Sequence, residues 1–298
     1  MLIIKNDSYV YKMSYDNKPV AYAASGEIIQ FETNDCYGNQ YVEEDQPRST
    51  INITHINPAT GPVYINYAKA GDTLKVEILD IKVNDHGVMR CTPGVGVYKD
   101  QITKARTKII PIIENKAIFN DNIHIPIRPM IGVIGTACEE GTFTNTPGKH
   151  GGNMDCKKIT KDSTLYLPVN VDGALLAMGD LHAIMGDGET VICGVEIQGL
   201  ITIKVSILKS INLPLPFLVN DDKAITIFSA ESLDSAASGA CISMHKYLTD
   251  YVGMDPNDAG MLLSLQGDLS VCQVVNPLVT CRMELPLELL KNYNTYLP

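Results

Sequence analysis

Hydrophobic and polar positions alternate through much of the first two-thirds of the chain. Residues 72–83 alternate through Leu74, Val76 and Ile78, slip at Leu79–Asp80, and then resume the alternation. A two-residue period is that of a half-buried strand, and the slip predicts a bulge. Similar runs with strand character occupy residues 26–33, 165–171, 190–197 and 202–208. Because Gly, Pro, Asn and Asp recur between these runs, the pattern predicts a β-sandwich-like or barrel-like structure.

The hydrophobic period changes in the last third of the chain. Residues 232–252 carry apolar side chains at intervals of three and four, which predicts a helix that ends at Gly253. Asp255 and Pro256 have the order of an N-cap and a first helical residue, so they predict a second helix, which stops at Gly267. The fold expected is mainly β (β-sandwich-like) with a C-terminal helical pair, α+β overall.

No repeat, low-complexity linker or compositional break divides the 298 residues. We therefore expect one domain over residues 1–298, with a β-rich part at 1–220 and a mixed α/β part at 221–298. The apolar fraction of 45% and the charged fraction of 19% are those of a folded globular protein.

Charge and cysteine content narrow the classes of partner. The net charge is −10, and the densest basic stretch, residues 99–108, is dispersed among polar residues, so nucleic acid is not expected as a partner. The longest apolar zone, residues 191–208, is interrupted by charged and polar side chains, so no membrane span is expected. The N-terminus lacks the pattern of a secretory signal, and the eight cysteines form no CxxC pair. Together these features predict reduced cysteines and a cytoplasmic location.

The first candidate site is the polar segment 144–156. His150 and Asp155 have metal-ligand side chains, and Gly151 and Gly152 allow the backbone to approach a ligand closely. By itself, this segment is equally compatible with a flexible surface loop.

The second candidate site is the segment 179–189, which follows an apolar run. If a strand continues through it, Asp180 and His182 point to the same face, and Asp187 and Glu189 repeat that spacing. Burying so many unpaired ionisable groups is costly, which favours a bound cation or a catalytic role over a solvated turn. An imidazole with carboxylates suits zinc or another transition metal, whereas a carboxylate-rich set suits calcium or magnesium.

The remaining candidate site residues have weaker support from the sequence. Asp35 lies in a polar turn after the run 26–33, and Glu140 follows an apolar run; each is equally compatible with a solvated turn. Cys138 and Cys156 adjoin the polar segments but lack the local signature of a nucleophile. No GxSxG elbow, P-loop or GxGxxG motif is present in the sequence.

Several segments taken together resemble the acetamidase/formamidase family. They are Pro147-Gly-x-His-Gly-Gly-Asn-Met-Asp155, Leu165-Tyr-Leu-Pro-Val169, Gly179-Asp-x-His-Ala183 and Gly186-Asp-Gly-Glu189. The resemblance implies hydrolysis of the C–N bond in small linear amides such as formamide and acetamide, releasing a carboxylate and ammonia. It also implies a metal in the pocket and a homodimer or larger homo-oligomer. One departure is Cys138, which replaces the proline of the family's Ala-Pro-x-Glu-Gly loop.

The working hypothesis from the sequence is amide hydrolysis by metal-activated water. Its metal, for which zinc is favoured and calcium is the alternative, is held by a predicted ligand set of Asp155, Asp180, His182 and Glu189. Glu140 or Asp187 is the expected base, with His150 as a further catalytic residue. Substrate contacts are assigned to Gly151, Gly152 and Asp35. Two alternatives stay open: a metal-independent amide hydrolase that uses a Cys or a carboxylate, and a non-catalytic, metal-stabilised β-sandwich that binds a ligand.

Overall fold

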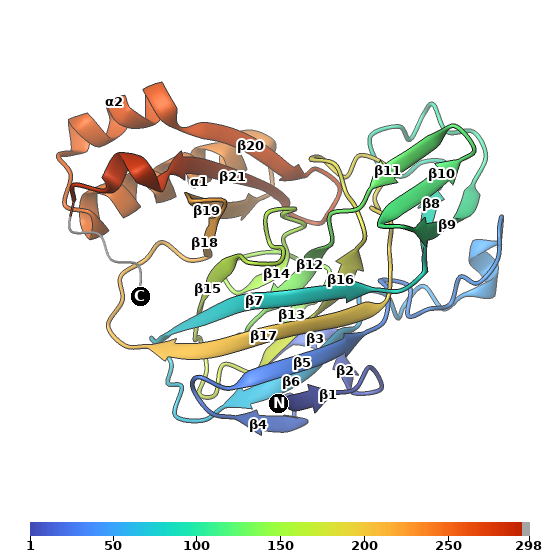
Figure 1. The fold of residues 1–298 in the computed structure, drawn as a ribbon, viewed down its shortest axis with the longest axis horizontal. Helices are drawn as coiled ribbons and strands as arrows, with labels where there is room; N and C mark the ends of the chain where they lie inside the picture. The colour runs from blue at the N-terminus through green and yellow to red at the C-terminus, as the bar shows by residue number, and fades with distance from the viewer. Residues whose placement is uncertain (294–298) are drawn as a thin grey trace.

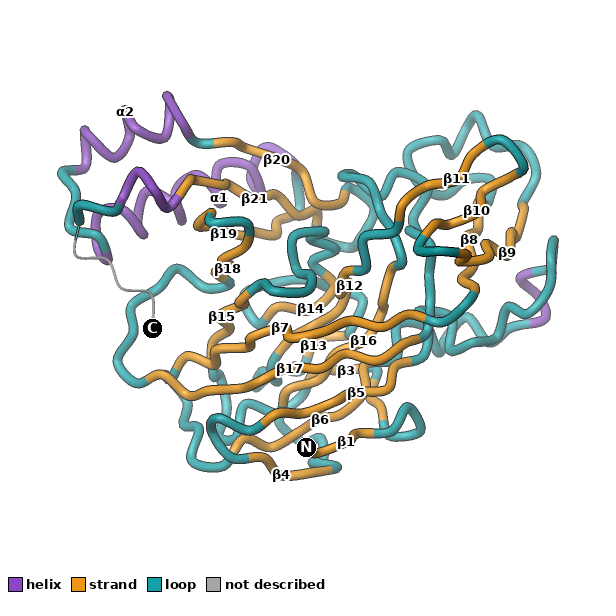
Figure 2. The backbone as a smooth tube through the Cα atoms, viewed as in Figure 1, coloured by secondary structure: helices purple, strands orange, loops and turns teal. Residues whose placement is uncertain are grey.

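The computed structural model describes residues 1–293 as several β-sheets with helices near the C-terminal end (Figures 1 and 2). The long strands β7 (Thr73–Val83) and β17 (Gly199–Leu208) pair antiparallel and cross the molecule side by side. Asp80 pairs with Thr202 and Ile78 with Ile203, which leaves Leu79 as the extra residue. The predicted bulge is therefore present, and it keeps the apolar side chains of β7 on the core side.

These two strands belong to a nine-stranded sheet with the order β1-β5-β17-β7-β15-β18-β19-β21-β20. Its other strands are β1 (Leu2–Ile4), β5 (Ile28–Thr33), β15 (Thr164–Pro168), β18 (Phe217–Asn220), β19 (Lys223–Ala230), β20 (Asp268–Gln273) and β21 (Val279–Pro286). The expected division after residue 220 falls in the turn between β18 and β19, which are neighbours in this sheet. The mixed α/β part thus continues the sheet of the β-rich part.

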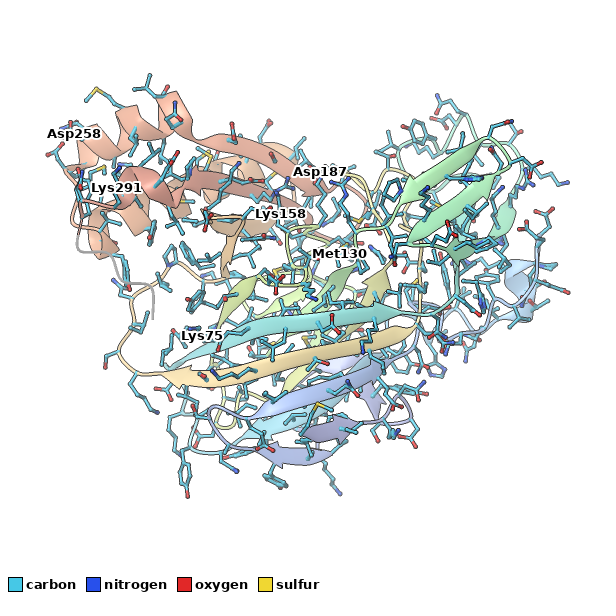
Figure 3. The ribbon with its side chains drawn as sticks, in the orientation of Figure 1. Lys75, Met130, Lys158, Asp187, Asp258 and Lys291 are labelled. Carbon is cyan, nitrogen blue, oxygen red and sulfur yellow. The ribbon has the colours of Figure 1, made fainter. Side chains whose placement is uncertain are left out.

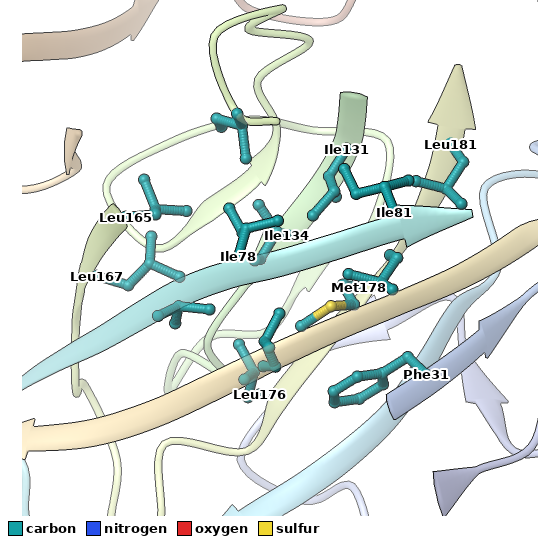
Figure 4. Packing of buried hydrophobic residues seen from close by; sticks show 14 of the residues in the cluster. Phe31, Ile78, Ile81, Ile131, Ile134, Leu165, Leu167, Leu176, Met178 and Leu181 are labelled. Atoms are coloured by element: carbon teal, nitrogen blue, oxygen red, sulfur yellow. The ribbon is translucent and has the colours of Figure 1, made fainter. Parts of the chain in front are cut away.

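A six-stranded sheet lies against the first. Its order is β14 (Gly151–Asn153), β12 (Met130–Gly135), β16 (Leu176–His182), β6 (Ala59–Ile65) and β2 (Tyr9–Val10), with β4 (Ala21–Ala23) parallel to β6. Side chains from both sheets interdigitate in one core cluster (Figure 4), including Ile78 and Leu165 from one sheet and Ile134 and Met178 from the other. The predicted β-sandwich-like architecture is confirmed.

Two smaller sheets complete the strands. One pairs β3 (Lys12–Met13) with β13 (Thr142–Phe143). The other, at the upper right of Figure 1, is formed by β8 (His86–Cys91), β9 (Arg106–Ile113), β10 (Lys116–Asn120) and β11 (Ile123–Pro126). Residues 190–197, where the sequence predicts a strand, form irregular chain with isolated bridges at Glu196.

The predicted C-terminal helical pair is also confirmed. Helix α1 (Leu233–Lys246) is capped by the Ser232 hydroxyl, which accepts a hydrogen bond from the Ser235 N–H, and it packs on β19 and β21. Helix α2 (Pro256–Gln266) is capped by the Asp255 carboxylate. The remaining helical turns are the π-helical η2 (Tyr247–Tyr251) and the 3₁₀ turns η1 (Arg48–Thr50) and η3 (Leu287–Leu290). Among residues 1–293, no helix is long and apolar enough to cross a membrane.

Candidate metal centre

Strand β16 brings Asp180 and His182 to one face of the six-stranded sheet. As their two-residue spacing predicts, the two side chains meet: Asp180 Oδ1 lies 3.6 Å from His182 Nε2. Both residues are buried. The strand therefore delivers an imidazole and a carboxylate into the interior.

Asp155 and Glu189 join this pair from two different loops. Asp155 Oδ1 lies 4.0 Å from His182 Nε2, and Glu189 Oε1 lies 3.9 Å from it. One ligand atom from each of Asp155, His182 and Glu189 lies within 4.8 Å of the other two. Three residues from separate parts of the sequence therefore form a set that could hold a metal ion.

Glu196 belongs to the same cluster, although it is not among the ligands predicted from the sequence. Its Oε1 lies 2.9 Å from His182 Nε2 and accepts a hydrogen bond from the Gly194 N–H. With Asp180 and the Cys36 thiol, it forms a second group of potential ligand atoms within 4.8 Å. The signal in the sequence is a single glutamate within the otherwise apolar run 191–197.

The acidic cluster, defined as Asp155, Asp180, Glu189 and Glu196 around His182, carries more carboxylates than its cationic partner can balance. Burial and the charge of Asp180 raise the pKa of Asp155 to about 6. Burial raises the pKa of Glu196 to about 8, and burial with the charge of Asp155 raises that of Glu189 well above its usual value. Burial alone would lower the pKa of His182, but Glu196 and Asp180 outweigh it and raise that pKa. The cluster thus favours additional positive charge, either protons or a metal cation.

The buried oxygens of the acidic cluster also lack other partners. One oxygen of each carboxylate makes no hydrogen bond within the described residues: Asp155 Oδ1, Asp180 Oδ1, Glu189 Oε2 and Glu196 Oε2. Buried polar atoms are nearly always paired, so unpaired oxygens on four carboxylates gathered around one imidazole fit a ligand that completes them. Imidazole nitrogen with carboxylate oxygen is the donor set of zinc and related divalent ions.

The backbone is strained where it presents these carboxylates. Asp155, Asp180 and Glu189 have φ angles of 43°, 55° and 48°, in the left-handed region that side-chain-bearing residues rarely adopt. Gly132 of β12 supplies the space: a Cβ there would lie 2.6 Å from Asp155 Oδ1 and 2.8 Å from Asp180 Oδ2. Only a glycine at this position leaves both carboxylates in place.

Two asparagines fix the carboxylates. The Asn57 amide donates to Asp180 Oδ2 at 3.1 Å, and the Asn276 amide donates to Asp155 Oδ2 at 2.7 Å. Asn57 precedes β6, and Asn276 lies between β20 and β21. No sequence signal marked Asn276, because its role depends on the C-terminal strands returning to the sandwich.

A cavity of about 220 Å³ leads to the acidic cluster. Asp180, Glu189 and Glu196 line it together with Cys36 and Asn57. Burial raises the pKa of the Cys36 thiol well above its usual value, so this thiol stays protonated and is a poor nucleophile.

Asp187, an expected base, forms ion pairs with Arg282 and Lys157. Its two oxygens accept hydrogen bonds from Arg282 Nη1 and Nη2 at 2.7 and 2.9 Å, and Lys157 Nζ lies 2.9 Å away. Although burial would raise its pKa, these two cations lower it. In Figure 3 Asp187 lies near the ends of β20 and β21. The structure thus gives Asp187 the geometry of an ion pair that anchors its loop.

His150 directly precedes β14, which contains the two glycines after it. His150 is buried, and burial lowers its pKa to about 4, so the ring is neutral. Its Nε2 faces Gly152, whose added Cβ would lie 2.9 Å from it, and the Gly151 N–H donates to the Gly148 carbonyl. Gly151 pairs with Gly135, whereas the acidic cluster surrounds Gly132. The structure therefore does not bring His150, Gly151 and Gly152 into the acidic cluster.

Glu140 lies apart from the acidic cluster, whereas Asp35 precedes Cys36 at its edge, where burial and, to a lesser extent, the charge of Asp180 raise the pKa of Asp35. Glu140 is exposed and lines a surface hollow with Asp72 and Cys138, beyond the end of β12. Asp35 is buried, and its Oδ1 accepts hydrogen bonds from the N–H groups of Tyr37 and Asn39, so it closes a turn. Desolvation by this burial raises the pKa of Asp35 to about 6.

Comparison with known proteins places the chain in a family. Residues 12–141 and 134–292 match the model of the Acetamidase/Formamidase family. A putative formamidase of Schizosaccharomyces pombe is 29% identical, over 62% of this chain and 60% of its own length. A formamidase of Methylophilus methylotrophus is 25% identical, over 69% of this chain and 65% of its own length. The chain thus spans less than two-thirds of the length of these two relatives.

Solved structures align over nearly the whole chain. The acetamidase of Bacillus halodurans has a TM-score of 0.97 and 45% identity, covering 99% of this chain and 100% of its own. A predicted acetamidase/formamidase of Thermoanaerobacter tengcongensis has a TM-score of 0.96 and 38% identity, covering 99% of each chain. The chain belongs to the acetamidase/formamidase family.

Proposed function

We propose that the protein hydrolyses the C–N bond of linear amides at the acidic cluster, producing a carboxylate and ammonia. The observation that carries the proposal is a buried imidazole among four carboxylates, with unpaired oxygens, at the end of a cavity. Family membership supports the same reaction class, since the relatives are named formamidase and acetamidase. A non-catalytic binding protein has no evident use for so many strained and unpaired carboxylates.

Asp155, His182 and Glu189 are the proposed metal ligands. Their donor set favours zinc, whereas calcium would require six to eight oxygen ligands. When bound, the ion supplies Lewis acidity that makes water nucleophilic at neutral pH and polarises the amide carbonyl. Asn276 holds Asp155 in the orientation that this role needs.

Glu196 is the proposed general base. Its Oε1 is occupied by the Gly194 N–H, whereas its Oε2 is unpaired and Glu196 lines the cavity. Oε2 can therefore take the proton of an attacking water and deliver it to the leaving amine nitrogen. Asp180, held by Asn57, shares the cluster, and its Oδ1 lies 3.6 Å from Nε2 of His182, whose ring must be neutral to bind the ion.

Asp187 and Glu140 have no part in the proposed mechanism. Asp187 is held in a bidentate ion pair with Arg282, and Glu140 lies in a different hollow. The predicted homodimer or larger homo-oligomer, and the cytoplasmic location, stay predictions.

The test combines metal analysis with an ammonia-release assay on formamide and acetamide. We expect about one zinc-like ion per chain, loss of activity with a chelator, and recovery on adding zinc. The His182→Ala variant should bind the metal at least about 100-fold more weakly, since even residues that merely support metal ligands contribute 10- to 100-fold. The control is His124→Ala, which alters an exposed histidine of β11.

Two results would count against this function. Full ammonia release by metal-free protein would favour the metal-independent carboxylate or cysteine alternative. Metal binding that tightens on adding an amide, without any ammonia release from wild type, would favour the ligand-binding alternative.

A further inference from the structure

The cavity above the acidic cluster has two chemically different ends. Asp180, Glu189 and Glu196 line one end, and Arg90 and Tyr41 line another part of the same cavity. Formamide and acetamide contain only a few non-hydrogen atoms and offer nothing for a second polar end to recognise. This second end therefore needs an explanation beyond the reaction itself.

Arg90 is a buried cation with a free donor. Its side chain is 8% exposed, and Nη1 donates to the Gln46 carbonyl and the Thr107 hydroxyl. Its Nε, in contrast, has no hydrogen-bond partner within the described residues. An unpaired N–H on a buried guanidinium is costly, so it marks a place where a ligand can supply an acceptor.

Tyr41 provides a second free donor beside Arg90. It is 5% exposed, its hydroxyl has no hydrogen-bond partner, and the Arg90 Cζ lies 5.3 Å from its ring centroid. Arg48 is exposed and also lines the cavity. The two guanidinium groups have donors and no acceptor, the phenol hydroxyl can add a further donor, and guanidinium groups match the geometry of a carboxylate.

The cavity also has apolar walls and is short. Ile51, Ile56 and Val95 contribute to those walls. Val88 pairs with Glu196 in an isolated bridge, and Arg90 lies two residues further along β8. At about 3.3 Å per strand residue, the two ends are offset by roughly 7 Å along the backbone. The cavity volume of about 220 Å³ leaves room for a short aliphatic chain.

We propose that the preferred substrate is a monoamide of a short aliphatic dicarboxylic acid, with its carboxylate bound by Arg90 and Tyr41. The amide group then lies at the acidic cluster, and the methylene chain contacts the apolar walls. The hydrolysis of the amide in this inference rests on the proposed function. The binding of the carboxylate rests on Arg90 and Tyr41 and is independent of that function.

The test compares pairs of amides of equal length, one neutral and one with a terminal carboxylate, of about four to six carbons. Hexanamide and the monoamide of adipic acid form one such pair. In the zinc-loaded wild type we expect kcat/KM for the carboxylated amide to exceed that for the neutral amide by about tenfold or more. Tyr41→Phe, which removes only the hydroxyl, should reduce this ratio several-fold, and Arg48→Gln should reduce it less. Tyr67→Phe alters an exposed tyrosine outside the cavity and serves as the matched control.

A binding measurement separates this inference from the proposed function. Calorimetry with the adipic monoamide should give binding to wild type that is weakened several-fold in Tyr41→Phe, whether or not ammonia is released. If neither amide of any pair is hydrolysed but this binding difference is found, the carboxylate subsite stands and the proposed function fails. A wild-type ratio at or below one, or binding and kcat/KM ratios unchanged in Tyr41→Phe, overturns the carboxylate subsite.

Discussion

Individual residues at the metal centre are held in conformations that are unfavourable by themselves. Asp155, Asp180 and Glu189 adopt left-handed backbone angles, each of which costs about 1–2 kcal/mol for a residue with a side chain. Their carboxylates are also buried with unpaired oxygens. Residues persist in such states only where the surrounding structure enforces them, and they cluster where a ligand gains from the arrangement.

The division of roles between two glutamates is testable. Glu196→Gln keeps the shape of the side chain but cannot accept the proton, so kcat for ammonia release should fall by about 100- to 10,000-fold. Glu140→Gln, at an exposed position in another hollow, should leave kcat within about twofold of wild type. Steady-state kinetics with metal analysis of each variant makes the comparison. If Glu140→Gln abolishes turnover, or Glu196→Gln loses its metal, the assignment of Glu196 as base is refuted.

At the scale of elements, the C-terminal strands β20 and β21 form hydrogen bonds that hold the loop carrying Glu189 in place. Gly188 donates its N–H to the Cys272 carbonyl and accepts from the Val274 N–H, which joins the Glu189 loop to β20. Arg282 of β21 holds Asp187 two residues before Glu189. The helices α1 and α2 pack against the same strands, so they act on the site indirectly by fixing β20 and β21.

Because β12 pairs closely with β16, adding one methyl group at Gly132 should have a measurable effect on stability and metal binding. Gly132→Ala should place a Cβ 2.8 Å from the Asp180 carbonyl oxygen, which belongs to the backbone and has little room to move. We expect a loss of about 1–3 kcal/mol in the free energy of unfolding, as for overpacked cores, together with weaker metal binding. Gly260→Ala is the control: it meets no atom within 4 Å in α2, so it should stabilise by up to about 1 kcal/mol. Denaturant unfolding and zinc titration measure both; wild-type metal affinity in Gly132→Ala would contradict the role given to this glycine.

Strands and helices with a regular hydrophobic period were predictable from the sequence, whereas the irregular structure of residues 190–197 was not. Strands β7 and β17, the bulge at Leu79 and both helices follow the hydrophobic pattern. Residues 190–197 are similarly apolar, but Ile192 is exposed, and Cys193, Val195 and Ile197 are buried beside β8 and β16 rather than within a ladder of their own. Burial, not strand pairing, makes this segment hydrophobic, and hydrophobicity alone does not distinguish the two.

For the molecule as a whole, the carboxylates of the acidic cluster couple stability to pH. In metal-free protein, the raised pKa values of Asp155 and Glu196 mean that the folded state keeps protons that the unfolded chain has released. The raised pKa of His182 acts in the same direction, since its stabilisation is lost as the ring deprotonates. The free energy of unfolding should therefore fall as pH rises from about 4 to about 8.

Thermal unfolding with chelator and with zinc measures this coupling. The chelated protein should lose several degrees in Tm between pH 5 and pH 8, whereas the zinc-loaded protein should lose much less. The gain in Tm on adding zinc should accordingly be larger at pH 8 than at pH 5. A chelated protein whose Tm rises over this pH range would show that the acidic cluster does not titrate as its burial requires.

The sequence by itself determined the cleanly alternating strands such as β7 and β17, the helical pair, the resemblance to the family and the local pair Asp180 and His182. These features depend on residues close together along the chain, where a period of two or of three to four fixes which side chains share a face. Only the tertiary structure decided that Glu196 and Asn276 join the site, that Asp187 pairs with Arg282, and that Glu140 lies apart. Those outcomes depend on contacts between segments that are distant in sequence, such as β16 with the 190–197 loop and β21 with the Glu189 loop. A local hydrophobic pattern cannot predict such contacts.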